Sequence, residues 1–451
     1  MINALRKFFG FGERSYQLTV PRSEENEGLL ILGDPGTGKT QCIHQLLDQI
    51  TSRKPQEAVI CYDPAGEFIE SHFDPDRDIV LNPLDLRCPE WMPCYDDQAS
   101  APMMKFIAES FFPCAEHSAA NTQFFIKAAR SIFAQMLTFS PTPARLVEML
   151  SDESLIDYCV ARTEHAHLIA KDAKGQRGGV LATLSEIGES FKLLVSEERP
   201  KRTLSLHRWT RQREGRFFIT STHSTRESLR RLQAAWINML LGNLLSTYSV
   251  SGQRPCWMII DEVHSLKHLP ILNSALVESR KYGVKMVLGT QNKAQFEEHY
   301  GRGAATMLAS AHTKVFFRCN EPESARWVSD MIGEEEKERP RIGTTATVQA
   351  NGRDSINYST FTERRSVVSK EQIMALPNLH GYWKYGDSVV PFRIEPIDRP
   401  KLAPSFIPRP TPVIQQEMKE QSLRITAPSS GNGDHATEIT SEMIDEVDTE
   451  F

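Results

Sequence analysis

The chain has 451 residues, 40% of them hydrophobic, which is enough to fill the core of one large domain or of two smaller ones. Its formal net charge of −6 at pH 7 excludes a protein that is basic overall, so any contact with nucleic acid must come from a local patch. Eight cysteines lie scattered without a Cys-x-x-Cys pair, which favours buried thiols in a reducing compartment over a metal site.

The first 24 residues are predicted to form a short N-terminal segment outside the main fold. Residues 1–17 combine three basic residues with three phenylalanines, so a weak amphipathic contact with a membrane surface is an alternative to packing or disorder. The apolar stretches of this segment are far too short to cross a bilayer. We expect neither a signal peptide nor a transmembrane helix.

A nucleotide-binding domain is predicted to begin at residue 25, and its first part covers residues 25–101. Residues 29–32 form the first predicted strand, a glycine-rich loop follows, and residues 40–50 then carry apolar side chains at helical spacing. Further strands are expected at residues 58–62, before a turn-rich segment, and at residues 79–81. Strand, loop and helix in this order form the arrangement that a phosphate-binding loop requires.

Residues 102–200 are predicted to form an inserted all-helical domain, because β-branched runs are few in this part of the chain. Segments with helical periodicity lie at residues 103–112, 123–137, 144–149 and 180–194.

The second part of the nucleotide-binding domain covers residues 201–410. Its predicted strands lie at residues 216–220, 256–260, 285–289 and 314–317, and residues 382–394 are typical of a hairpin. Apolar strands that alternate with helices predict an α/β fold with a mostly parallel, doubly wound sheet.

The composition changes again near the C-terminus, where residues 411–451 are predicted to be a disordered acidic tail. Residues 434–451 contain several acids, no Lys or Arg, and spaced apolar side chains that end in Phe451. This pattern is typical of a solvated chain end. The alternative is a peptide that docks on a basic partner protein.

The glycine-rich loop has the residue types that bind a nucleotide triphosphate. Its glycines let backbone N–H groups turn inward around an anion, Lys39 adds a positive charge at the β- and γ-phosphates, and the hydroxyl of Thr40 is a ligand for Mg²⁺. The predicted binding residues are Gly33, Asp34, Pro35, Gly36, Thr37, Gly38, Lys39 and Thr40. A structural turn rich in glycine and proline is the alternative, and the strand–loop–helix context favours ATP binding.

Two carboxylates, Asp261 and Glu262, follow the predicted strand at residues 256–260. Open α/β sheets bind their ligands at the carboxyl ends of the strands. Asp261 suits the Mg²⁺ shell, reached through water, and Glu262 is placed to polarise the attacking water as general base. Charged residues commonly end strands, so the pair alone is a weak signal. It predicts a catalytic role only in combination with the phosphate-binding loop.

Hydrolysis also requires a group that senses the γ-phosphate and a positive charge that stabilises the transition state. Gln291, which follows the strand at residues 285–289, is the predicted sensor. The candidate arginine fingers are Arg280 and Arg318, and a surface salt bridge is the alternative for either. A finger that acts on a neighbouring chain would require a ring of subunits.

These residues resemble the type IV coupling proteins, the DNA-pumping ATPases of conjugative transfer, and especially their TraD and TrwB branches. The resemblance covers about residues 25–410 and rests on the phosphate-binding loop, on Asp261-Glu262 and on segments without a derived catalytic role. These segments are residues 62–68, 81–85, 280–283, 289–291, 316–318 and 399–404.

The resemblance implies a RecA-like P-loop NTPase fold with an inserted all-α domain, assembled as a homo-hexamer around a channel for single-stranded DNA. It implies ATP and Mg²⁺ as cofactors. The implied partners are the relaxase of the nicked plasmid and inner-membrane components of a type IV secretion system. Residues 446–451 resemble the acidic tail with which F-type members meet a relaxosome accessory DNA-binding protein.

The start of the chain departs from the family pattern. Members usually begin with transmembrane helices, whereas the phosphate-binding loop of this chain already begins at residue 33. We therefore expect a naturally soluble form, a form whose membrane part has been lost, or a form whose membrane part is supplied by another chain. The expected location is the cytoplasm, with peripheral contact at the inner membrane as the alternative.

The leading hypothesis is a DNA-dependent ATPase that recruits relaxase-bound DNA and pumps single-stranded DNA toward a secretion channel. A double-stranded DNA translocase of the FtsK or HerA kind shares the same sheet and active-site logic, and the predicted helical insertion argues against it. A second alternative is a recruitment adaptor in which nucleotide only switches conformation. Glu262 and Gln291 favour turnover over mere binding.

Overall fold

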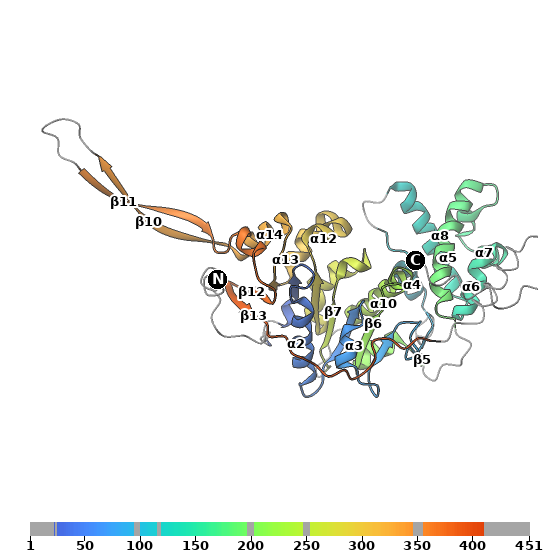
Figure 1. Ribbon diagram of the computed structural model, residues 1–451. Coiled ribbons are helices and arrows are strands. Elements are labelled where there is room, and N and C mark those ends of the chain that lie inside the picture. The colour runs from blue at the N-terminus through green and yellow to red at the C-terminus, as the bar shows by residue number, and fades with distance from the viewer. Residues whose placement is uncertain are drawn as a thin grey trace, which may run out of the picture. The chain divides into compact units, whose positions relative to one another are not determined.

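The computed structural model describes residues 22, 25–93, 100–114, 119–195, 203–246, 253–345 and 355–409 (Figure 1). Nearly all of the predicted N-terminal segment, residues 1–24, and the whole predicted acidic tail, residues 411–451, therefore lie outside the described residues. Within the described ranges, no helix is long and apolar enough to cross a membrane.

A nine-stranded sheet runs through the fold, in the order β13-β12-β9-β1-β8-β7-β2-β6-β3. The strands are β1 (Leu29–Leu32), β2 (Ala58–Asp63), β3 (Ile79–Leu81), β6 (Arg216–Thr220), β7 (Cys256–Ile260), β8 (Val284–Thr290), β9 (Thr313–Phe316), β12 (His380–Tyr385) and β13 (Ser388–Arg393). All neighbours from β9 to β3 pair in parallel, and the hairpin of β12 and β13 joins β9 antiparallel. This confirms the predicted mostly parallel sheet and the predicted hairpin.

The parallel strands are buried on both faces, as their continuous apolar sequences predict. Alternate side chains of one strand enter two different hydrophobic clusters. Leu30 of β1 and Ile60 of β2 belong to the larger cluster, whereas Ile31 and Cys61 belong to the second. Since successive side chains of a strand point to opposite faces, each face of the sheet has its own core.

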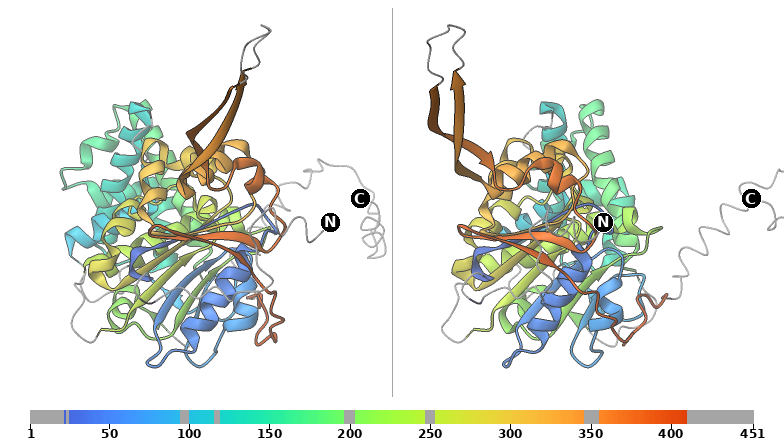
Figure 2. Two further views of the ribbon diagram at one scale, coloured as in Figure 1. Left: turned by 90° about the vertical axis from the view of Figure 1, so that its left-hand side faces the viewer. Right: turned by 60° about the vertical axis from the view of Figure 1, so that its left-hand side comes forward.

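Helices cover both faces of this sheet (Figure 2). The helix after β1, α2 (Lys39–Thr51), buries Cys42, Ile43 and Leu46 in the second cluster, whereas the long helix α10 (Arg226–Ser246) buries its apolar side chains in the larger one. The other helices around the sheet are α3 (Glu67–His72), α9 (Leu206–Gln212), α11 (Leu272–Glu278), α12 (Lys293–Tyr300), α13 (Ala304–Ser310), α14 (Pro322–Ile332) and α15 (Lys370–Met374). Short 3₁₀ helices are η1 (Glu25–Glu27), η3 (Val263–Leu266), η4 (Ser279–Tyr282) and η5 (Gly301–Gly303).

The segment predicted as a helical insertion contains only helices in its described residues. They are α4 (Ala101–Phe111), α5 (Ala120–Leu137), α6 (Pro143–Ser151), α7 (Glu153–Val160), η2 (Ala166–Ile169) and α8 (Lys174–Lys192) (Figure 1). Their aromatic core includes Phe111 and Phe191, whose ring centroids lie 5.0 Å apart. It continues into the larger cluster of the sheet, and Asn238 of α10 donates a hydrogen bond to Ser110 of α4 at 2.8 Å. The boundaries 102–200 of a separate domain stay a prediction.

The long antiparallel pair β10 (Glu334–Thr345) and β11 (Ser355–Ser366) was not expected from the sequence. Most of its residues are polar, so the apolar runs that reveal the central strands are absent. A weak signal exists in Ile356, Tyr358 and Thr360, β-formers at alternate positions. Two further short strands, β4 (Glu90–Trp91) and β5 (Thr203–Leu204), pair in parallel.

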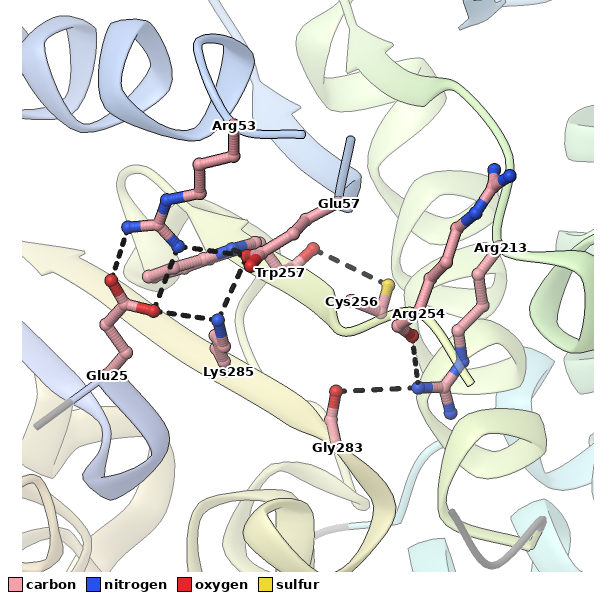
Figure 3. A network of polar contacts seen from close by, with 9 residues as sticks. All are labelled: Glu25, Arg53, Glu57, Arg213, Arg254, Cys256, Trp257, Gly283 and Lys285. Atoms are coloured by element: carbon pink, nitrogen blue, oxygen red, sulfur yellow. Dashed lines mark hydrogen bonds and ion pairs between the residues drawn. The ribbon is translucent and has the colours of Figure 1, made fainter. Parts of the chain in front are cut away.

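A buried ion-pair cluster lies at the amino ends of β7 and β8 (Figure 3). The ammonium group of Lys285 is 2.7 Å from a carboxylate oxygen of Glu25 and 2.9 Å from one of Glu57. Arg53, two residues after the end of α2, pairs with the same two carboxylates, and Trp257 donates its indole N–H to Glu57. The charges of two cations and two carboxylates thus compensate each other in this cluster, which lies at the opposite end of the strands from their carboxyl ends.

Candidate functional site

The glycine-rich loop leaves β1 between the carboxyl ends of β8 and β9, its two neighbours in the sheet. The N–H of Gly33 donates to the carbonyl of Thr290, the last residue of β8, at 3.3 Å, and the N–H of Asp34 donates to the carbonyl of Arg318 after β9 at 2.9 Å. The carboxylate of Asp34 accepts from the N–H of Asn320 at 2.7 Å. The loop is therefore fixed to both neighbours at the edge where open α/β sheets bind ligands.

Three positions of this loop require glycine. A Cβ atom at Gly33 would lie 2.6 Å from the Cβ atom of Phe317, closer than real Cβ contacts come. Gly36 and Gly38 have φ angles of 72° and 125°, which side chains of L-residues rarely adopt. Backbone N–H groups can then approach an anion closely, which is the property that the sequence predicts.

The side chain of Lys39 points back into the loop. Its Nζ atom donates to the carbonyl oxygens of Gly33 at 2.6 Å and Asp34 at 3.0 Å. Burial lowers the pKa of Lys39 from its usual value, against the carboxylates of Asp261 and Glu262, which raise it. The charges of Lys39 and of both carboxylates after β7 therefore act on one another, while the catalytic roles of these residues stay predictions.

Asp261 follows β7, and its half-buried side chain has one buried carboxylate oxygen, Oδ1. Its Oδ1 atom has no hydrogen-bond partner among the described residues, and a Cβ atom at Gly289 of β8 would lie 2.7 Å from it. Burial, and then the charge of Glu262, raise the pKa of Asp261 to about 6, whereas Lys39 lowers it. A buried carboxylate oxygen without a donor costs free energy, so this atom is suited to a cation or its water shell.

The residues present fit a magnesium ion bound together with a nucleotide. Thr40, half-buried in the first turn of α2, follows Lys39 directly and lies at the phosphate loop. Within the described part of the chain, no group of three or more His, Cys, Asp or Glu side chains could hold a metal ion. Thr40 and Asp261 would therefore share the ion with water and phosphate oxygens, as Mg²⁺ usually requires.

Glu262 has a strained backbone and a carboxylate that is contacted from two sides. Its φ angle is 54°, in the left-handed region that non-glycine residues rarely adopt. Gln291 donates to Oε1 at 3.4 Å, and Arg226 lies 3.4 Å from Oε2. Such strain persists only where surrounding contacts fix it, and it is common at active sites.

The two candidate arginine fingers lie at different places. Arg318 is beside the loop, since its carbonyl accepts from Asp34, and its Nη1 atom donates to the carbonyl of Leu376 at 3.3 Å. Arg280 lies in η4, ahead of the amino end of β8, and pairs with Glu27 of η1. Its side chain is 67% exposed. Within one chain, Arg280 thus lies at the amino ends of the strands, whereas the phosphate loop lies at their carboxyl ends.

Segment 62–68, which carries part of the family resemblance, lies at the same edge as the loop. Asp63 ends β2, the neighbour of β7, and its carboxylate accepts from the N–H groups of Glu67 at 3.1 Å and Phe68 at 2.8 Å. Burial raises the pKa of Asp63 to about 7. Asp63 therefore fixes the turn between β2 and α3.

Arg226 also lies at the site, although it is not among the residues predicted from the sequence. It begins α10, shortly after β6, and β6 ends at the same edge of the sheet as β1 and β7. A cation soon after the end of a parallel strand was the available signal. The chain contains many arginines, so this signal does not distinguish Arg226 from the others. The contacts of Arg226 with Glu262 and with the turn after Asp63 are visible only in three dimensions.

The sequence as a whole matches known proteins of conjugation. A profile described as the type IV secretion-system coupling protein DNA-binding domain matches residues 16–395. Coupling protein TraD of Escherichia coli (strain K12) is 28% identical over 447 residues, which are 95% of this chain and 60% of TraD. Conjugal transfer protein TraG of Rhizobium radiobacter is 26% identical over 143 residues, which are 31% of this chain and 22% of TraG. This chain thus spans about 60% of the length of TraD.

Solved structures of a conjugative coupling protein share the fold. The unbound monoclinic form of TrwBdeltaN70 has a TM-score of 0.75 and 24% identity, and the match covers 90% of this chain and 94% of that one. TrwB in complex with ADP and Mg²⁺ has a TM-score of 0.73 and 23% identity, with 90% and 94% covered. The likeness confirms the predicted α/β fold of the P-loop NTPase type with its mostly parallel sheet.

Proposed function

Because the chain belongs to the family of type IV secretion-system coupling protein DNA-binding domains, we propose that it is an ATPase motor of conjugative transfer. It hydrolyses ATP and uses the energy to move single-stranded DNA toward a secretion channel. The observation that carries this proposal is the buried, unpartnered Oδ1 atom of Asp261 beside a phosphate loop that already encloses Lys39, among the residues that the structure describes.

Each residue of the site has a role in this proposal. The backbone N–H groups of residues 33–38 and the ammonium group of Lys39 bind the phosphates. The Thr40 hydroxyl and, through water, Asp261 hold Mg²⁺, which neutralises charge on the phosphate oxygens when bound. Glu262 orients and polarises the attacking water.

Gln291 and the two arginines complete the proposed machinery. Gln291, already 3.4 Å from Glu262, reports the presence of the γ-phosphate to the base. Arg318 lies beside the loop and suits the site of its own chain. Arg280, exposed at the opposite edge, suits the site of the next chain in a ring, so a homo-hexamer is part of the proposal.

The proposed substrate is relaxase-bound single-stranded DNA, and the proposed partners are those of the coupling-protein family. Inner-membrane components of the secretion system would receive the DNA. The acidic residues of segment 434–451 would bind a basic accessory protein of the relaxosome.

The rate of ATP hydrolysis in the presence of different DNAs tests the motor proposal. We expect single-stranded DNA to stimulate the rate more than duplex DNA of equal nucleotide content, and we expect the stimulation to fall as salt is raised. Stronger stimulation by duplex DNA would favour a double-stranded DNA translocase. A rate that ignores both DNAs at low and moderate salt would contradict the proposal.

A further inference from the structure

A guanidinium group lies against the carboxylate that is proposed to act as general base. The Nη1 atom of Arg226 is 3.4 Å from Oε2 of Glu262, and its Nη2 atom donates to the carbonyl of Pro64 at 3.3 Å. Gln291 contacts the other carboxylate oxygen at 3.4 Å. Arg226 and Gln291 thus hold one oxygen each, and the remaining lone pairs of the carboxylate stay available to water.

The base of the Arg226 side chain is itself fixed. Arg226 is the first residue of α10, and its N–H donates to the carbonyl of Thr222 at 3.0 Å. Two turns further along the helix, the side chain of Gln233 donates to the carbonyl of Thr220 at 2.6 Å, which ties α10 to the end of β6. The main chain of Arg226, from which the guanidinium extends, is therefore fixed relative to the sheet.

The main chain of Glu262 is held separately from its side chain. Its carbonyl accepts from the N–H of Ser265 at 3.0 Å and from the hydroxyl of Ser265 at 2.8 Å. That hydroxyl is 2.8 Å from the hydroxyl of Tyr62 in β2. These bonds maintain the left-handed backbone of Glu262 but do not orient its carboxylate, which depends on Arg226 and Gln291.

The contacts of Arg226 are poor ones for a structural role. Its ion pair with Glu262 is long and half-buried, and such pairs contribute little to folding stability. Its Nε atom is buried and has no hydrogen-bond partner among the residues that the structure covers, which costs free energy. An arginine whose contacts add so little to stability fits a role in the reaction better than a structural role.

We propose that Arg226 is a positioning residue for Glu262, so that the start of α10 sets where the carboxylate meets the attacking water. This inference rests on the proposed ATPase function and on the role of Glu262 in it. Arg226 need not contact the nucleotide, because it acts through the orientation of the base.

Steady-state and single-turnover ATP hydrolysis by the full chain test this inference. We expect Arg226→Ala to lower kcat about tenfold or more while KM for ATP changes little, because binding does not involve Arg226. Arg226→Lys should recover part of the rate, since it returns the charge without the forked geometry. Arg230→Ala, which removes an exposed pair with Glu227 one turn along the same helix, is the matched control and should behave as wild type.

A double variant that combines Arg226→Ala with Glu262→Gln tests whether Arg226 affects the rate through Glu262 or in another way. If Arg226 only positions Glu262, Arg226→Ala should add no further loss of single-turnover rate to Glu262→Gln. Multiplied losses in the double variant, an effect on KM alone, or a wild-type rate for Arg226→Ala would each overturn the inference.

Failure of the proposed function has a different outcome. A wild-type chain that binds but does not hydrolyse ATP, with or without DNA, would overturn both proposals. Normal wild-type hydrolysis that is lost in Glu262→Gln, together with an unaffected Arg226→Ala, would overturn only the role of Arg226. Unchanged thermal unfolding of Arg226→Ala should accompany the loss of rate.

Discussion

Lys39 donates a hydrogen bond from its ammonium group to the carbonyl of Gly33, with 2.6 Å between the two atoms. A second bond to Asp34, at 3.0 Å, closes the loop around the same nitrogen. On nucleotide binding, the phosphate oxygens would have to replace these carbonyls as hydrogen-bond acceptors of the Lys39 ammonium group. Lys39 is therefore important both to the loop and to its ligand.

We expect Lys39→Ala to lower the rate of ATP hydrolysis about 100-fold or more, because it removes the charge that stabilises the transferred phosphoryl group. Colorimetric phosphate release measures the rate, and a fluorescent ATP analogue measures binding. Lys281→Ala, at an exposed position, is the control and should keep the wild-type rate. In a conjugation assay, normal DNA transfer by Lys39→Ala would favour the recruitment adaptor and contradict the motor.

Gly289 of β8 gives the carboxylate of Asp261 its space. A Cβ atom there would lie 2.7 Å from Oδ1 of Asp261 and 3.3 Å from its Cα atom. We expect Gly289→Ala to displace the carboxylate, so that half-maximal hydrolysis requires about tenfold more Mg²⁺. Titration of the rate with Mg²⁺ measures this shift.

The control for Gly289→Ala is Gly178→Ala in α8, where an added Cβ atom meets nothing within 4 Å. Alanine also favours a helix over glycine, so this variant should fold and hydrolyse ATP as wild type. An unchanged Mg²⁺ dependence of Gly289→Ala would argue against Asp261 as part of the magnesium site.

Arg280 lies too far from its own phosphate loop to act there, since it pairs with Glu27 ahead of β1. If it acts on the neighbouring chain, Arg280→Ala and Lys39→Ala should each be inactive, yet a mixture of the two should recover activity. In randomly mixed rings, about a quarter of the interfaces would combine an intact loop with an intact Arg280. Mixing experiments over a range of ratios measure this recovery.

The mixture of Lys39→Ala with Arg318→Ala provides the contrast for Arg280. The position of Arg318 beside Asp34 is the reason that we assign it to the site of its own chain, and a mixture of those variants leaves intact sites only if Arg318 acts in trans. We expect no recovery there. Recovery with Arg318→Ala and none with Arg280→Ala would reverse the assignment of the two arginines.

The sequence was sufficient for the central strands and for the conformation of the glycine-rich loop, because both depend on local patterns. Residues 29–32 and 256–260 are short apolar runs, and the loop requires glycine at Gly36 and Gly38 because their positive φ angles are a local property of the backbone. Arg226 could not be found in this way, since its contact with Glu262 arises from the order of β6, β2 and β7 in the sheet. The hairpin β10–β11 was missed because polar strands carry no core pattern.

The cluster in Figure 3 predicts a stability effect without a direct effect on catalysis. Lys285→Met would leave the buried carboxylate of Glu25 and the half-buried carboxylate of Glu57 with Arg53 as their main cation. Breaking a buried pair from one side costs about 3–5 kcal/mol, so the free energy of unfolding should fall by this order.

Urea denaturation followed by circular dichroism measures the effect of Lys285→Met. Lys281→Met, an exposed position four residues earlier, is the matched control and should leave the unfolding curve unchanged. Because the cluster is buried, the loss in Lys285→Met should persist in high salt. A wild-type unfolding curve for this variant would show that the cluster contributes little.

A buried pair of histidines predicts how stability depends on pH. Nδ1 of His44 in α2 lies 2.9 Å from Nε2 of His72 in α3. Burial, and then Arg399, lower the pKa of His44 to about 4, against the effect of Asp48. Burial, and then His44, lower the pKa of His72 to about 3. Both side chains are therefore neutral in the folded chain near neutral pH.

The direction in which the free energy of unfolding changes with pH follows from proton uptake by the unfolded chain. A histidine in the unfolded state takes up a proton below pH about 6.5, whereas the folded pair resists protonation down to about pH 4. Within this window the unfolded state binds more protons, so the free energy of unfolding falls as the pH falls. Each histidine contributes up to about 1.4 kcal/mol per pH unit.

Urea denaturation between pH 7.5 and pH 5 tests this expectation. The double variant His44→Gln, His72→Gln should lose stability less steeply than wild type on acidification, because neither glutamine takes up a proton on unfolding. His223→Gln, at an exposed position, is the control and should keep the wild-type slope. If the double variant and the wild type give parallel curves of unfolding free energy against pH, the pair does not resist protonation in the folded chain.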